Sequence, residues 1–106
     1  MTAFSSDCPV SAFEPLKGIR NAVCELTGSG APYVPAEAIG VEEALRAYTV
    51  AGAYASFEER IKGQIAPGML ADFAVLAQDP RAVSPTALAD IPVTMTIGGG
   101  EPIYGG

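Results

Sequence analysis

Several residue types are absent or scarce in this 106-residue sequence. It has no histidine and no tryptophan, and six basic residues stand against twelve acidic ones, for a net charge of −6. The basic residues are scattered singly, whereas a nucleic-acid binder needs a clustered basic surface, so that class is excluded. No apolar run reaches the roughly 18 residues of a membrane span, and no basic start precedes an apolar stretch. We therefore predict no membrane span, no secretory signal and a cytoplasmic location.

The lack of histidine also limits metal chemistry. Catalytic zinc usually takes about three protein ligands, mostly nitrogen, plus one open position. We expect no metal or cofactor in this chain alone. Cysteine is scarce too, since Cys8 and Cys24 stand sixteen residues apart and match no zinc or redox spacing. This spacing predicts two buried free thiols in a reducing cytoplasm.

What is present indicates one folded domain. Apolar residues make up 49% of the chain, enough to offset the entropy of folding, and the length suits a single domain. Charged residues make up only 17%, below the roughly 25% of ordinary soluble domains. The low charge suggests that part of the apolar surface faces another domain or subunit.

Two helices are expected in the first half. Over residues 15–26, Pro15 suits a first helical position, and an apolar face recurs at spacings of three and four. Residues 27–40 are rich in glycine, proline, serine and alanine and predict a loop. Over residues 41–57 a second helix is predicted, with Glu42 and Glu43 in its first turn and apolar residues on both sides. Such a helix is normally buried on several sides, and Tyr48, Tyr54 and Phe57 are interpreted as core packing.

Strand signals follow. Residues 62–72 contain Pro67-Gly68, which predicts a type II turn, and Asp72 is expected to make local hydrogen bonds. Residues 72–77 form a short apolar run that predicts a buried strand, and residues 91–97 alternate with period two, which predicts a half-buried strand. Residues 98–100 are three glycines and predict a hairpin turn into residues 101–104. They do not predict a phosphate site, because no helix follows them whose N-terminus could bind the anion. The fold class is therefore α+β, with two helices before a sheet of three to four strands.

Four motifs together carry a family resemblance. They are SDCPV at 6–10, EALRAYT at 43–49, KGQIAPGMLAD at 62–72 and VTMTIGG at 93–99. In this order the chain resembles the C-terminal end of the amidohydrolase superfamily, especially its N-substituted formamide deformylase branch. The resemblance implies a TIM-type barrel beside a β-sandwich built from both ends of the chain. On that basis residues 1–60 are a remnant of the last barrel unit and residues 61–106 a portion of the sandwich.

The resemblance assigns a chemical role to one residue. In such enzymes the aspartate after the last barrel strand binds a divalent metal, most often zinc, and accepts a proton from the attacking water; Asp7 matches that position. Cys8 departs from the pattern, since a bulky aromatic is common there, and this leaves substrate preference open. The family's histidine ligands are absent. In the isolated chain, a solvated or capping carboxylate is the alternative interpretation of Asp7. Glu58 and Glu59 are interpreted as a solvated face, because adjacent helical residues point apart.

Three functional hypotheses remain. The first is a fragment of a hydrolase of non-peptide C–N bonds that is inactive alone, because the histidine metal ligands are absent. Its distinguishing feature is that Met1 lies just before Asp7, with every upstream barrel element missing. The second is a free-standing structural or interaction module that self-associates through residues 41–57. The third is a subunit that completes a separate barrel chain and supplies Asp7 to it.

Overall fold

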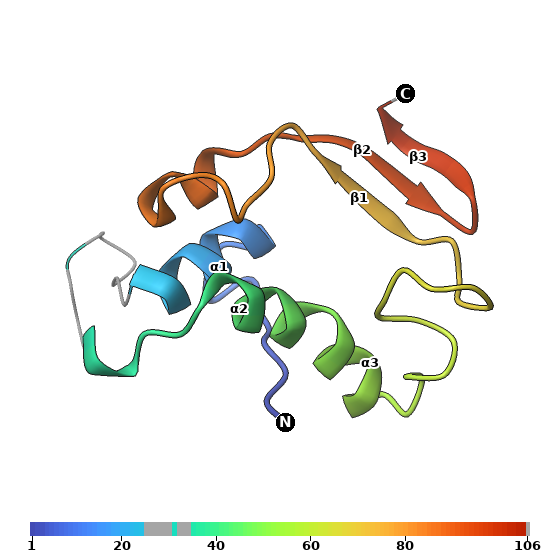
Figure 1. Ribbon diagram of the computed structural model, residues 1–106, viewed down its shortest axis with the longest axis horizontal. Coiled ribbons are helices and arrows are strands. Elements are labelled where there is room, and N and C mark those ends of the chain that lie inside the picture. Colours follow the sequence, from blue (N-terminus) through green and yellow to red (C-terminus); the bar gives the residue numbers. More distant parts are fainter. Residues whose placement is uncertain (25–30, 32–34, 106) are drawn as a thin grey trace.

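The computed structural model describes residues 1–24, 31 and 35–105, and it confirms the α+β class, with helices first and strands after. The helices form one layer, and the sheet extends beyond it toward the C-terminus (Figure 1). In chain order the elements are α1 (Pro15–Cys24), the 3₁₀ turn η1 (Pro35–Glu37), α2 (Val41–Tyr48), α3 (Val50–Ala55), β1 (Phe73–Leu76), the 3₁₀ helix η2 (Pro85–Asp90), β2 (Val93–Gly98) and β3 (Glu101–Gly105). In the described part of the chain, no helix is long and apolar enough to cross a membrane.

The first helix, α1, begins at Pro15 as predicted and ends at Cys24. Ile19 on its apolar face is buried, and Leu16 and Val23 pack beside it. The predicted end of this helix, residues 25–26, lies outside the described residues. So do 27–30 and 32–34 of the predicted loop. The described remainder of that loop contains the short turn η1, which the loop prediction did not anticipate.

The single helix predicted over residues 41–57 is wrong, because two helices occupy this stretch. The break falls at Thr49, whose φ of −121° and ψ of −86° are not helical. The Thr49 hydroxyl donates to the Leu45 carbonyl oxygen at 2.8 Å, and this back-bonding to the preceding turn is known to bend helices. The helix after the break, α3, ends at Ala55. Phe57 beyond it adopts a left-handed φ of 60°, and 92% of its surface is exposed. Tyr54 is also exposed. Of the three aromatic residues that were predicted to pack in the core, only Tyr48 packs against the core cluster.

The core lies between the helices and the segment before β2. Its buried members are Ile19 on α1, Ala44 on α2, Leu88 on η2 and Ile91. Leu76 at the end of β1 packs against this cluster. The core thus joins the helical layer to one end of the sheet.

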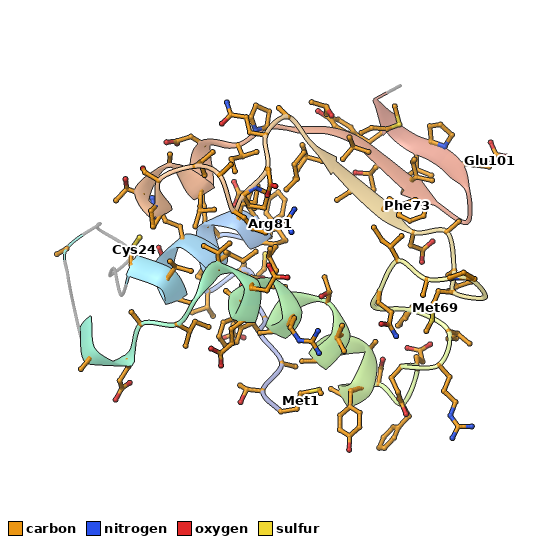
Figure 2. All side chains as sticks on the ribbon, viewed as in Figure 1. Met1, Cys24, Met69, Phe73, Arg81 and Glu101 are labelled. Carbon is orange, nitrogen blue, oxygen red and sulfur yellow. The ribbon has the colours of Figure 1, made fainter. Side chains whose placement is uncertain are left out.

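The sheet is antiparallel, in the order β1-β2-β3. Phe73 pairs with Ile97 and Val75 with Met95, and cross-strand partners share a face, so these four apolar side chains lie on one side. None of the residues of β1, β2 or β3 is buried. Side chains project from both faces of the sheet, with Phe73 on β1 and Glu101 at the start of β3 (Figure 2). Phe73, Met95 and Ile97 are half-buried and Val75 is 40% exposed, so this face is only partly covered within the described residues. The buried strand predicted over residues 72–77 is therefore wrong as to its burial.

The turn at Pro67-Gly68 and the hairpin after β2 form as predicted, whereas the hydrogen bond of Asp72 differs from the prediction. The Met69 N–H donates to the Ala66 carbonyl oxygen at 3.1 Å around Pro67-Gly68, and Gly68 has the positive φ that a type II turn requires. The hairpin between β2 and β3 turns at Gly99 and Gly100, both with positive φ. Asp72, in contrast, does not bond locally, because its Oδ1 accepts the Gly99 N–H at 2.8 Å from across the sheet. The 62–72 motif thus also makes a tertiary contact, with the turn that follows β2.

Candidate functional site

Asp7 lies in an exposed turn ahead of α1. Its carbonyl oxygen accepts the Val10 N–H at 2.8 Å, and its own N–H donates to Ser5 Oγ at 3.3 Å. The next N–H, of Cys8, donates to Ser6 Oγ at 3.2 Å. Asp7 has a φ of 52°, a left-handed conformation that is uncommon outside glycine and that recurs at functional sites. Three local hydrogen bonds thus hold this backbone while Asp7 stays exposed.

An exposed carboxylate can bind a cation or accept a proton. Among residues 1–24, 31 and 35–105, however, no group of three or more histidine, cysteine, aspartate or glutamate side chains could hold a metal ion. The residues described here therefore do not by themselves fit a catalytic zinc site. The predicted role of Asp7 therefore remains a prediction.

Two grooves flank the segment that leads to Asp7. The larger, of 950 Å³, lies between the first residues and α2–α3, and its wall combines apolar Phe4 and Ala47 with acidic Glu42 and Glu43. The smaller, of 530 Å³, lies between this segment and α1, with Tyr48 in its wall. Asp7 lines neither groove. The turn therefore borders the smaller groove through Ser5, Ser6, Val10 and Ser11, while Asp7 itself does not line it.

The two adjacent glutamates after α3 have different surroundings. Glu58 forms an ion pair with Lys62, and the pKa of Glu58 is lowered chiefly by the hydrogen bond from Lys62 and then by that from Ser56. Glu59 is half-buried, and its Oε2 is enclosed without a hydrogen-bond partner among the described residues. The interpretation of both as a solvated face is thus wrong for Glu59.

The cysteines are both free thiols, as predicted, but neither is buried. Cys8 is exposed beside Asp7, and Cys24 is half-buried at the end of α1 (Figure 2). Neither has the apolar enclosure that makes a thiol a core residue. Their exposure therefore corrects the sequence interpretation.

Sequence reasoning did not anticipate the two serines that support Asp7. Ser5 and Ser6 accept backbone N–H groups two residues further along the chain. Serine hydroxyls commonly bond to the nearby backbone in turns, so the Ser-Ser-Asp sequence ahead of Pro9 was the available signal. A third serine, Ser11, donates its hydroxyl to the Ser6 carbonyl oxygen and closes the turn.

Comparison with known proteins identifies relatives. Residues 1–104 match the Amidohydrolase family. The Bacillus subtilis protein YtcJ, named as an amidohydrolase, is 35% identical over 107 residues, which cover 98% of this chain and 20% of that protein. The N-substituted formamide deformylase of Arthrobacter pascens is 35% identical over 94 residues, 89% of this chain and 17% of the relative. The Arabidopsis thaliana protein LONG AFTER FAR-RED 3 is 34% identical over 110 residues, 98% of this chain and 18% of the relative.

No solved structure matches the chain at a significant level. The chain spans about a fifth of the length of the curated relatives that it matches. The family match nevertheless covers nearly every residue, from the turn of Asp7 to the end of β3. This chain belongs to the Amidohydrolase family.

Proposed function

We propose that this chain is the C-terminal part of a metal-dependent amidohydrolase that hydrolyses C–N bonds other than peptide bonds. The observation that carries the proposal is the family match over residues 1–104 combined with coverage of about a fifth of each relative. The deformylase relative, named for action on N-substituted formamides, supports this class of reaction. Residues 1–60 would belong to the last barrel unit and residues 61–106 to a β-sandwich.

In this proposal Asp7 is the reacting group of the chain. Its carboxylate would accept the proton of the attacking water, and it would serve as one ligand of a divalent metal, zinc being the first choice. The other ligands would come from outside this chain, because no group of three or more candidate ligand side chains gathers in its described part. The left-handed, hydrogen-bonded backbone of Asp7 supports the role, since it presents the carboxylate to solvent.

The open sheet supports a larger protein around this chain. Phe73, Val75, Met95 and Ile97 share one face and none of them is buried. Complete burial of an exposed apolar side chain contributes about 1.5–3 kcal/mol, so the partial burial of this face leaves a fraction of that energy unused at each residue. A second layer supplied by the remainder of the protein would recover that energy. Because this sequence has no histidine to act as a metal ligand, this chain alone is expected to be inactive.

A second candidate function has one observation in its favour. Tyr54 and Phe57 are exposed at the end of the 41–57 stretch, and Val50 is only half-buried. A free-standing module could bury this surface against a copy of itself or against a partner chain that Asp7 completes. The partner would in either case be protein, not nucleic acid and not membrane.

The test begins with the native polypeptide. Antibody capture from cell extract followed by intact mass measurement distinguishes a product several-fold larger than 10.8 kDa from the chain alone. The larger product, loaded with zinc, is expected to release formate from an N-alkylformamide, and Asp7→Asn is expected to lower kcat by about 100-fold or more. Hydrolysis that survives Asp7→Asn would refute the role of Asp7. A native product of 10.8 kDa would instead favour the free-standing module.

A further inference from the structure

The segment that carries Asp7 meets the helical layer at Phe4. Residues 1–14 contain no helix or strand. The Phe4 N–H donates to the Ala47 carbonyl oxygen at 3.0 Å, and the Phe4 ring packs edge-on against Tyr48, with ring centroids 5.7 Å apart and planes at 80°. Phe4 is half-buried, whereas Thr2 and Ala3 just before it are exposed. Two different interactions thus tie this one residue to the last turn of α2.

Beyond Phe4 the chain is organised by its own hydrogen bonds. The serine hydroxyls and the Asp7–Val10 turn link residues 5–11 to one another. A hollow of 530 Å³ separates this turn from α1, so close packing on α1 does not fix its orientation. Asp7 is three residues from Phe4, and a chain reaches at most about 3.6 Å per residue. The Phe4 contact therefore sets where the turn, and Asp7 with it, stands relative to the helices.

Tyr48 also lies close against α1. A Cβ added to Gly18 on α1 would lie 2.0 Å from the Tyr48 hydroxyl oxygen and 2.9 Å from Cζ, so the tyrosine occupies the space that glycine leaves. An edge-on aromatic pair contributes about 0.5–1.5 kcal/mol beyond its buried area. Contacts thus run from α1 through Tyr48 to Phe4 and then along the chain to Asp7.

We infer that Phe4 and Tyr48 are positioning residues that hold Asp7 in its reactive place. The inference rests on the proposed function of Asp7, although the positioning itself is a property of this chain. Errors of about 1 Å in the placement of a catalytic group can cost about 100-fold in rate. Removing the Phe4 ring should therefore lower kcat without a matching change in KM, since neither ring is assigned to substrate binding.

The first test uses the 106-residue chain and nuclear magnetic resonance. Phe4→Ala and Tyr48→Leu are expected to lower the backbone heteronuclear Overhauser effect at residues 5–10 while the sheet signals stay unchanged. Phe13→Ala is the matched control, because Phe13 belongs to the same segment and is 70% exposed. Tyr48→Phe keeps the ring and should behave like the unmodified chain. Unchanged order at residues 5–10 in both Phe4→Ala and Tyr48→Leu would overturn the positioning role.

The second test uses the longer, zinc-loaded protein and formate release from an N-alkylformamide. Phe4→Ala is expected to lower kcat about ten-fold or more, and to have no further effect in an Asp7→Asn background, because it acts through Asp7. If Asp7→Asn leaves the rate unchanged, the proposed function fails. If Asp7→Asn abolishes the rate but Phe4→Ala matches Phe13→Ala, the positioning inference alone fails. A full additional loss in the Asp7→Asn background would also contradict it.

Discussion

At the scale of single residues, Gly18 shows how tightly α1 and α2 are packed. Alanine there would favour the helix by about 0.5–1 kcal/mol, but its Cβ would lie 2.0 Å from the Tyr48 hydroxyl oxygen. Overpacking of this kind costs about 1–3 kcal/mol. We therefore expect Gly18→Ala to lower the free energy of unfolding by about 1 kcal/mol, measured by urea denaturation.

The chain offers a matched control and a rescue for this change. Gly52 lies in α3, and a Cβ built on it meets nothing within 4 Å, so Gly52→Ala should stabilise the chain by about 0.5–1 kcal/mol. Adding Tyr48→Phe to Gly18→Ala removes the closest clashing atom and should restore part of the loss. Equal stabilisation by both glycine substitutions would mean that Tyr48 is not held against α1.

Glu58 supplies a prediction about pH. Its pKa lies below the ordinary value of 4.5, because Lys62 and then Ser56 donate hydrogen bonds to the carboxylate. A lowered folded-state pKa contributes stability that is present above the unfolded pKa and is lost as pH falls through the folded value. The Glu58 contribution should therefore disappear as the solution is acidified below about pH 4.5. It should be small, since this ion pair is largely exposed.

A carboxyl titration by nuclear magnetic resonance measures this directly. Lys62→Met should raise the pKa of Glu58 toward 4.5 and leave the pKa of Glu14 unchanged. Lys17→Met should do the reverse, because Lys17 lies 2.9 Å from the Glu14 carboxylate and lowers its pKa. If neither lysine substitution moves its own glutamate, the two ion pairs do not persist in solution.

At the scale of elements, the short helix η2 is central to the core. Leu88 is fully buried there, between α1 and α2. Leu88→Ala should lower the free energy of unfolding by about 2–5 kcal/mol through lost transfer energy and a cavity. Leu70→Ala is the control, because Leu70 is 48% exposed and outside this cluster, and it should cost less than about 1 kcal/mol. Thermal unfolding followed by circular dichroism separates the two, and equal losses would disprove this account of the core.

The same scale shows which elements the sequence can predict. Pro15 and the glutamates at 42 and 43 placed the starts of two helices correctly, because the causes are local to the first turn. The Gly99–Gly100 turn was equally predictable from backbone freedom. The break at Thr49 was not, since apolar periodicity continues through it and only the hydroxyl bond to Leu45 marks it. Asp72 bonds across 27 residues, and no local pattern reports such a distance.

At the scale of the whole molecule, the sequence shows which residues are apolar but not which of them are covered by other parts of the protein. Low charge suggested that apolar surface faces another domain or subunit, and large apolar side chains such as Phe57 and Ile103 are indeed exposed. What covers them in solution stays a prediction. Apolar periodicity predicted that Phe57 packs in the core, but it could not show that this side chain is exposed in this chain. Asp7 was found through family resemblance alone. Its left-handed turn depends on hydroxyl contacts that the sequence only suggests.

The same surplus surface predicts that the chain self-associates. Tyr54 is 57% exposed and Phe57 92% exposed, both at the end of the 41–57 stretch, so pairing with a second copy would remove this apolar area from water. Sedimentation velocity should show a dimer at high concentration, and Phe57→Asp should shift it toward monomer, because a carboxylate there would be desolvated on pairing. Ile103→Asp on β3 is the control, because Ile103 is 71% exposed and β3 lies across the molecule from α3 (Figure 1).

The outcomes separate the two apolar surfaces. If Ile103→Asp disperses the dimer and Phe57→Asp does not, the association runs through the sheet, and residues 41–57 are not the interface. If the unmodified chain stays monomeric at high concentration and binds no dye that reports exposed apolar surface, self-association is excluded. The face of the sheet formed by Phe73, Val75, Met95 and Ile97, which is only partly buried within the described residues, would then not be a self-association surface either.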